Sequence, residues 1–197
     1  MKDGIIYVFP EEEEFFTWWE PQPYLCEHER WVKWGKMHKV WLLNPNVPIN
    51  YAVVGEPLRG LKKQEELNVE LRFLFLEGEF FKDEAEYYRE SKSNMAAESY
   101  IPSGTFSPTN DPDFVETPTV LMGGTVVGVE EMQWQDERVF KIDLRFDGHI
   151  FRVIAQDGFG DLGIHVGNII RGFFHVLGRE ARPSENTSQT ASNEVKA

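Results

Sequence analysis

The chain has one cysteine, no long apolar run and few basic residues for its length. Cys26 is alone among 197 residues, so no disulfide can form within the chain and nothing indicates an oxidising compartment. No apolar run approaches the roughly 20 residues of a membrane span. The apolar start Ile5–Phe9 is followed by Pro10 and four glutamates, which is not the pattern of a secretory signal peptide. We therefore expect a soluble, cytoplasmic protein.

The shortage of basic residues gives the chain a strong acidic excess. It has 33 Asp and Glu against 20 Lys and Arg, a formal net charge of −13. Such a field repels polyanions, and phosphate neutralisation normally dominates nucleic-acid affinity. Non-specific nucleic-acid binding is therefore disfavoured, although a local basic groove is still compatible with this composition.

Aromatic residues are abundant, with six Trp and fifteen Phe. Many of them lie near the N-terminus, before and after Pro21 and Pro23. Large rings of this kind either fill a core or mark an interaction surface, and so short a segment has little room to bury them all. The sequence leaves both readings open. If the rings form an interface, its candidates are Trp18, Trp19, Trp31 and Trp34.

Alternating apolar residues predict strands in much of the chain. Leu67–Leu76 alternates with period two and becomes apolar on both faces at its end, which predicts a strand. A helical stripe follows, and we expect one helix near residues 80–97. For Tyr24–Trp41 the spacing fits a helix or a strand, and both stay open. No internal repeat is visible in the sequence.

The densest strand signal lies after the proline-rich stretch Tyr100–Pro118. Thr119–Met132 is broken by three glycines, which permit the bulges and coiling of a barrel strand. Asp147-Gly148 stands between two apolar-rich strands and predicts a tight hairpin. A last strand is expected at Ile169–Leu177. The remaining tail is polar and lacks aromatics, so we expect it to be disordered.

The glycine-broken strand, the Asp147-Gly148 hairpin and the run Gly163–Gly172 resemble an OB-fold-like β-barrel. The OB fold is a five-stranded Greek-key barrel, and Leu67–Leu76 would supply a missing strand. We therefore expect a mainly β (α+β) protein with a small OB-like barrel in its C-terminal half and an N-terminal α+β elaboration. The expected division is 1–66 for the aromatic-rich elaboration, 67–178 for the barrel with an inserted helix (core 117–178), and 179–197 for the tail.

An OB-like barrel implies a binding face of exposed aromatic rings beside basic residues. The basic candidates are Lys141, Arg145, Arg152 and Arg171, and the aromatic candidate is Phe151. The alternative is that the barrel aromatics fill the core, as buried rings usually do. Between residues 119 and 178, acidic residues outnumber basic ones. This excess favours the reading in which the aromatic rings fill the core.

Catalysis and metal binding have weaker signals. Asp143 and His149 lie in the same hairpin, where a carboxylate could hold an imidazole for general-base work. No nucleophile motif, phosphate loop or dinucleotide fingerprint accompanies them. Cys26, His28 and His38 lack the spacing of a zinc site, so no metal and no cofactor is expected.

These observations favour a non-enzymatic binding protein of bacterial type, whose partner is another protein or a second copy of itself. A binder of single-stranded nucleic acid or oligosaccharide through the barrel face is one alternative. A hydrolase-type enzyme using Asp143 and His149 is another. Enzymatic activity is left undecided, with its absence favoured.

Overall fold

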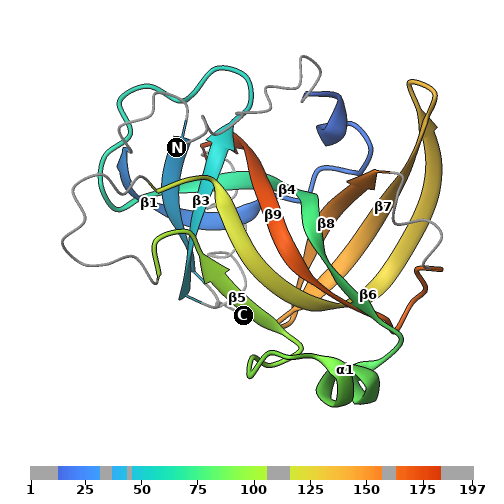
Figure 1. Cartoon of the computed structure of the whole chain (residues 1–197). Helices are drawn as coiled ribbons and strands as arrows, with labels where there is room; N and C mark the ends of the chain where they lie inside the picture. The colour runs from blue at the N-terminus through green and yellow to red at the C-terminus, as the bar shows by residue number, and fades with distance from the viewer. Residues whose placement is uncertain (1–12, 32–36, 44–45, 106–115, 157–162, 183–197) are drawn as a thin grey trace, which may run out of the picture.

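The computed structural model describes residues 13–31, 37–43, 46–105, 116–156 and 163–182. Within them, nine strands form one sheet that closes on itself (Figure 1). The expectation of a mainly β, barrel-like fold is confirmed. None of the helices in the described part of the chain is long and apolar enough to cross a membrane. The division into domains at residue 66 stays a prediction, while strands from both sides of it hydrogen-bond into the same sheet.

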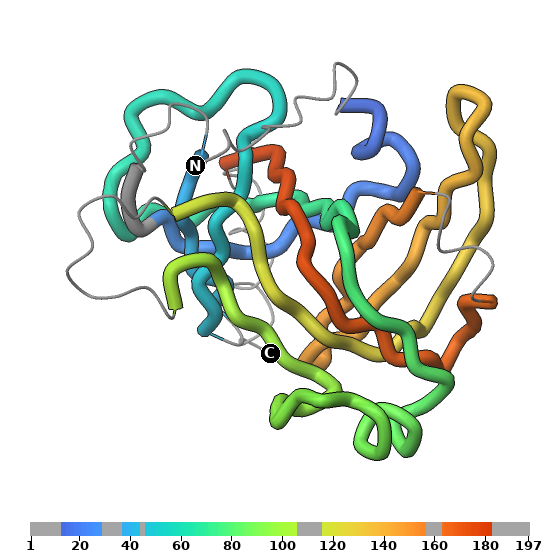
Figure 2. Tube along the Cα trace, in the orientation of Figure 1, coloured from blue at the N-terminus to red at the C-terminus, as the bar shows by residue number. Residues whose placement is uncertain are grey.

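Two long strands are shared by the whole sheet. β4 (Glu65–Phe81) and β9 (Ile169–Ala181) pair antiparallel from Asn68 opposite Ala181 to Phe81 opposite Ile169. Figure 2 shows β9 (orange to red) running beside β4 (green) and β6 (yellow). Because β9 continues to Ala181, the first residues of the predicted tail are strand residues, and residues 183–197 lie outside the described part.

The strands before β4 close one ring of the sheet, which we call the N-terminal ring. It contains β1 (Tyr24–Trp31), β2 (Met37–Leu43) and β3 (Asn46–Val53), an antiparallel meander. β1 pairs antiparallel with the first part of β4. β3 pairs in parallel with the last part of β9, through Ala52–Leu177 and Val53–Gly178. For Tyr24–Trp41 the sequence left helix and strand open, and the described residues of this segment form strands.

The strands after β4 close a second ring, the C-terminal ring, in the same way. β6 (Thr119–Trp134), β7 (Glu137–Phe146) and β8 (His149–Gln156) form an antiparallel meander. β6 pairs antiparallel with the first part of β9, and β8 pairs in parallel with the middle of β4. The two rings therefore have the same pattern of pairings. β4 is the antiparallel closing strand of the N-terminal ring and the parallel closing strand of the C-terminal ring, and β9 is the reverse. β5 (Ser99–Pro102) adds to the edge of β6.

Local chemistry explains several of these elements. The β7–β8 turn has positive φ at both Asp147 and Gly148, as a two-residue primed turn requires, so the predicted hairpin is confirmed. Helix α1 (Glu84–Glu90) is shorter than predicted, because β4 continues to Phe81 and the Asp83 side chain caps the helix by accepting from Glu86 N at 2.8 Å.

One apolar core fills the interior of both rings. The inward residues of β4 alternate from Leu67 to Phe75 and pack with inward residues of every other long strand. One outward apolar residue from each of β4, β7, β8 and β9 belongs to a separate apolar cluster outside the sheet, which we call the outer apolar cluster. Its buried members are Phe15, Phe16, Val54, Leu74, Val139, Ile154 and Leu177. The outer cluster positions the candidate site.

Candidate functional site: a cationic face beneath the N-terminal segment

Four cationic side chains gather on the outer face of the sheet beside the outer apolar cluster. Strand alternation places them there: Arg72 precedes Leu74 by two residues, Arg152 precedes Ile154 by two, and Arg179 follows Leu177 by two. Lys141 is opposite Ile154 in the β7–β8 register. We call this set of residues on β4, β7, β8 and β9 the cationic face: Arg72, Lys141, Arg152 and Arg179.

Residues 13–23, here called the N-terminal segment, lie across this face. A single 3₁₀ turn, η1 (Glu14–Phe16), buries the rings of Phe15 and Phe16. The Trp18 ring packs edge-on against Phe15 at 5.0 Å and against Trp134 at 5.9 Å. Trp134 Nε1 donates to Glu14 Oε2 at 3.1 Å. Aromatic packing therefore holds the segment, and no residue of it belongs to a strand of the sheet.

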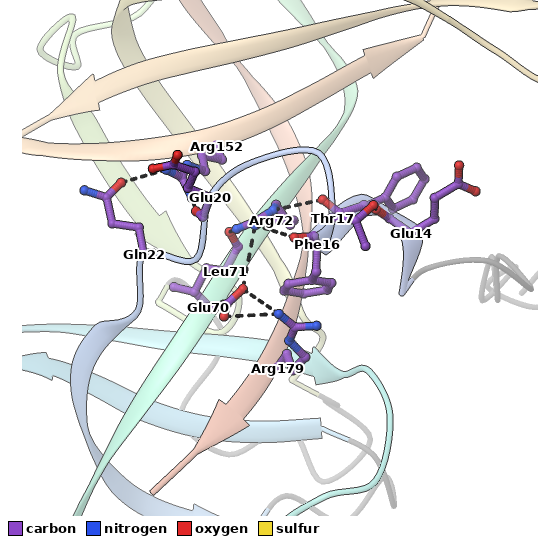
Figure 3. Close-up of polar contacts among 11 residues, drawn as sticks. Glu14, Phe16, Thr17, Glu20, Gln22, Glu70, Leu71, Arg72, Arg152 and Arg179 are labelled. Carbon is purple, nitrogen blue, oxygen red and sulfur yellow. Dashed lines mark hydrogen bonds and ion pairs between the residues drawn. The ribbon is translucent and has the colours of Figure 1, made fainter. Parts of the chain in front are cut away.

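Arg72 is fully buried between the sheet and the N-terminal segment (Figure 3). Its guanidinium donates to Phe15 O at 3.1 Å, Phe16 O at 3.4 Å and Leu71 O at 2.8 Å. Its nearest carboxylate, on Glu70, is 3.8 Å away. Burial, followed by repulsion from Arg152, lowers the pKa of Arg72 to about 10. Arg72 thus remains charged at neutral pH, with its charge held mainly by carbonyl groups.

The indole ring of Trp19 lies within cation–π distance of three members of the face. The Arg72 guanidinium is 5.1 Å from the ring centroid, Lys141 Nζ is 5.2 Å away and Arg152 is 5.8 Å away. Arg152 also donates to Glu20 O at 2.6 Å and to Gln22 Oε1 at 2.8 Å (Figure 3). A polypeptide backbone, an amide and an aromatic ring are therefore the groups that this face contacts.

The face carries an excess of positive charge. Glu70 bonds Arg179 at 3.0 Å, and Glu130 bonds Lys141 at 2.6 Å. With Asp143, which lies on the same face opposite Arg152, four cations and three carboxylates leave one net positive charge, in a chain whose formal charge is −13. Within the described residues, Arg152 makes no ion pair, and Oδ1 of Asp143, the residue opposite Arg152 in the register, makes no hydrogen bond.

The structure brings together four of the residues singled out from the sequence and separates the others. Lys141, Arg152, Trp18 and Trp19 meet at the N-terminal segment. Arg145 pairs instead with Glu98 at 3.0 Å, and Arg171 with Glu79 at 3.4 Å. Phe151 is fully buried in the core. Trp31 lies in β1, but its side chain and all of Trp34 fall outside what the structure describes.

Asp143 and His149 do not approach one another. In the β7–β8 register Asp143 is opposite Arg152, and His149 is opposite Phe146. His149 shares the inner face with Phe151, whose ring is stacked at 6.5 Å from its own, whereas Asp143 lies on the outer face. The candidate carboxylate–imidazole pair is therefore not formed, because strand alternation places the two side chains on opposite sides of the sheet.

Sequence reasoning missed Arg72 and Arg179. Arg72 stands in an alternating strand, where an outward basic residue is ordinary, and Arg179 was assigned to the tail. The available signal was the combination of an acidic, aromatic N-terminus with outward basic residues on several strands. Only the long-range pairings that bring β4, β7, β8 and β9 together could have connected these features.

A second cluster of polar side chains is buried inside the N-terminal ring. Glu180 of β9 accepts hydrogen bonds from Tyr51 Oη, His38 Nδ1 and Leu58 N. Burial would raise the pKa of the Glu180 carboxyl, but the bonds from His38 and Tyr51 outweigh it, so the pKa lies below its ordinary value. Burial and the Glu180 charge raise the pKa of Tyr51 well above its ordinary value.

This buried cluster fastens the sheet. Its side chains come from β2, β3 and β9, where β3 and β9 pair through only two residue pairs. His38 and Tyr51 are fully buried. In the described part of the chain, no three His, Cys, Asp or Glu side chains are arranged to hold a metal ion. The cluster therefore links β2 and β3 to β9 through side-chain hydrogen bonds.

Comparisons with protein-family models, with curated proteins and with solved structures find no match to this chain.

Proposed function

We propose that this chain is a non-enzymatic binding protein whose cationic face recognises a segment of another protein. The observation that carries the proposal is the way the face holds residues 13–22. Its guanidinium groups donate to backbone carbonyls and to an amide, and its cations lie against an indole ring. These are the groups that a polypeptide presents. The excess positive charge favours an acidic segment.

The proposal includes an OB-like identity for each ring. In each one, a three-stranded antiparallel meander is closed by two further strands, one parallel to the third strand and one antiparallel to the first. This arrangement fits a five-stranded Greek-key barrel. OB-like barrels use outer strand faces for binding, which supports the assignment of function to the face rather than to the buried core.

The same chemistry also suits single-stranded nucleic acid, because a base could stack where Trp19 lies and a phosphate could replace a carbonyl group. The net charge of −13 opposes this second candidate. A titration with two anionic polymers distinguishes binding of an acidic protein segment from binding of single-stranded nucleic acid.

We expect poly-L-glutamate to bind the full-length protein, as followed by tryptophan fluorescence, and oligothymidine of equal charge to bind more weakly. The double variant Lys141→Ala/Arg152→Ala should weaken poly-L-glutamate binding by about tenfold or more, because two of the four cations of the face are lost. Arg145→Ala is the matched control. Arg145 lies on β7, as Lys141 does, but it pairs with Glu98. Its replacement should therefore leave binding unchanged.

Tighter binding of the oligonucleotide, with loss in the double variant, would transfer the function to nucleic acid. Equal weakening by Arg145→Ala would show that the polymer senses general charge, and the assignment to this face would fail.

A further inference from the structure

We infer that the N-terminal segment is a displaceable occupant of the cationic face, and that the external partner is an acidic segment with paired aromatic residues, like Phe15-Phe16-Thr17-Trp18-Trp19. This inference rests on the proposed function and names its partner class. It also implies regulation, since the tethered segment and the partner compete for one face.

The first support is the cost of the buried cation. If the N-terminal segment only covered the outer apolar cluster, an apolar residue at position 72 would serve stability at least as well. Apolar replacement of a buried ion is often neutral or stabilising. Arg72 is instead fully buried, and its guanidinium lies over the Phe16 ring at 4.8 Å. A retained charge beneath a peptide is explained if the peptide is what it recognises.

The second support is that the segment can leave without breaking the sheet. All backbone pairings of the nine strands are made without residues 13–23, apart from the entry to β1. η1 has no side-chain cap at its start. Residues 20–23, the end of the segment that leads into β1, are exposed and include Pro21 and Pro23. The segment is therefore an attached cover rather than part of the barrel.

The third support is an alternative partner for Arg152. With the segment in place, Arg152 bonds Glu20 O and Gln22 Oε1. Asp143 faces it across the β7–β8 pairing, with Oδ1 unbonded in the described part of the chain. When the segment leaves, Arg152 can turn to Asp143, so the open face loses less than its full set of polar contacts. Arg179 likewise keeps Glu70.

The aromatic rings, more than the carboxylates, carry the specificity. Phe15 and Phe16 are buried, and three cations lie within cation–π distance of Trp19. The segment places its carbonyls, not its carboxylates, on Arg72 and Arg152. Acidic residues therefore steer the segment through the positive field, while ring packing selects it.

The test uses two synthetic peptides and the full-length protein. One peptide has the sequence of residues 13–23, and the other replaces its Phe and Trp residues by alanine at the same charge. Each is titrated against the wild-type chain and against Phe15→Ala/Trp18→Ala, which weakens the tethered occupant. Gln22→Ala is a milder second variant that removes only one bond to Arg152.

We expect the aromatic peptide to bind the double variant about 10- to 100-fold more tightly than the wild-type chain, because a tethered competitor acts at a high effective concentration. Gln22→Ala should shift affinity in the same direction by less. The alanine peptide, which keeps only the charge, should bind both forms far more weakly than the aromatic peptide does.

Equal binding of the two peptides would overturn the inference but leave recognition of acidic segments in place. Equal affinity of the aromatic peptide for wild type and both variants would overturn the tethered competition. If neither peptide nor poly-L-glutamate bound any form, the proposed function itself would fail.

Discussion

Replacing Glu180 by alanine is expected to lower the free energy of unfolding by about 3–5 kcal/mol, the usual cost of removing one partner from a buried charged network. Glu180 accepts from three groups on β2, β3 and the loop after β3. Its loss leaves the Tyr51 hydroxyl and the His38 ring buried without that acceptor. β3 and β9 pair through two residue pairs, and Val54 N donates to Gly178 O beside them, so the bonds to Glu180 supplement a short ladder. Chemical denaturation measures the change.

Two variants control this experiment. Glu180→Gln keeps an acceptor oxygen and should lose less stability than alanine does. Glu79→Ala removes a carboxylate that is 57% exposed and pairs with Arg171, so it should change the free energy by no more than about 0.5 kcal/mol. A loss in Glu180→Ala as small as that in Glu79→Ala would show that the buried cluster does not stabilise the pairing of β3 with β9.

Replacing Gly172 by alanine is expected to cost about 3 kcal/mol, the upper part of the range for overpacking. Gly172 lies opposite Gly78 where β4 and β9 cross. A Cβ at Gly172 would come within 2.2 Å of Glu77 O and 2.6 Å of a Phe75 ring carbon. Backbone of the shared strand pair would have to move, and both rings depend on that pair. Thermal or denaturant unfolding gives the measurement.

Gly128→Ala is the matched control for Gly172→Ala. Gly128 is also a strand glycine, but the atoms nearest to its Cβ would belong to the Asp143 side chain, at 3.1 Å and beyond. That side chain can rotate, so we expect a loss of no more than about 1 kcal/mol. Similar losses at both positions would contradict the close approach of β4 and β9.

Local signals in the sequence predicted the local structure of the C-terminal ring. The Asp147-Gly148 turn is encoded by two residues that tolerate positive φ, and β6 is encoded by alternation broken only by glycine. The sharing of β4 and β9 between two rings could not be predicted, because it depends on pairings between residues about 100 positions apart, such as Asn68 with Ala181. The pattern of pairings that the two rings share has no counterpart in sequence repetition.

For the same reason, only part of the candidate site could be predicted from the sequence. Lys141 and Arg152 were singled out as basic residues of the barrel, and Trp18 and Trp19 as aromatic residues of the N-terminus. That these sets meet is a tertiary fact, carried by Phe15 and Phe16 packing against Leu74, Ile154 and Leu177. The Asp143–His149 pair was misjudged because two positions in one hairpin share a face only when the register places them there.

Fluorine NMR of protein labelled with fluorotryptophan reports directly on whether the N-terminal segment leaves the cationic face. When the aromatic peptide of residues 13–23 is added to saturation, we expect the Trp18 and Trp19 signals to move to the positions of exposed indoles. The Trp41 signal, from β2 of the N-terminal ring, should stay in place. Peptide binding that leaves the Trp18 and Trp19 signals unchanged would contradict the account, because the partner would then bind somewhere other than the cationic face.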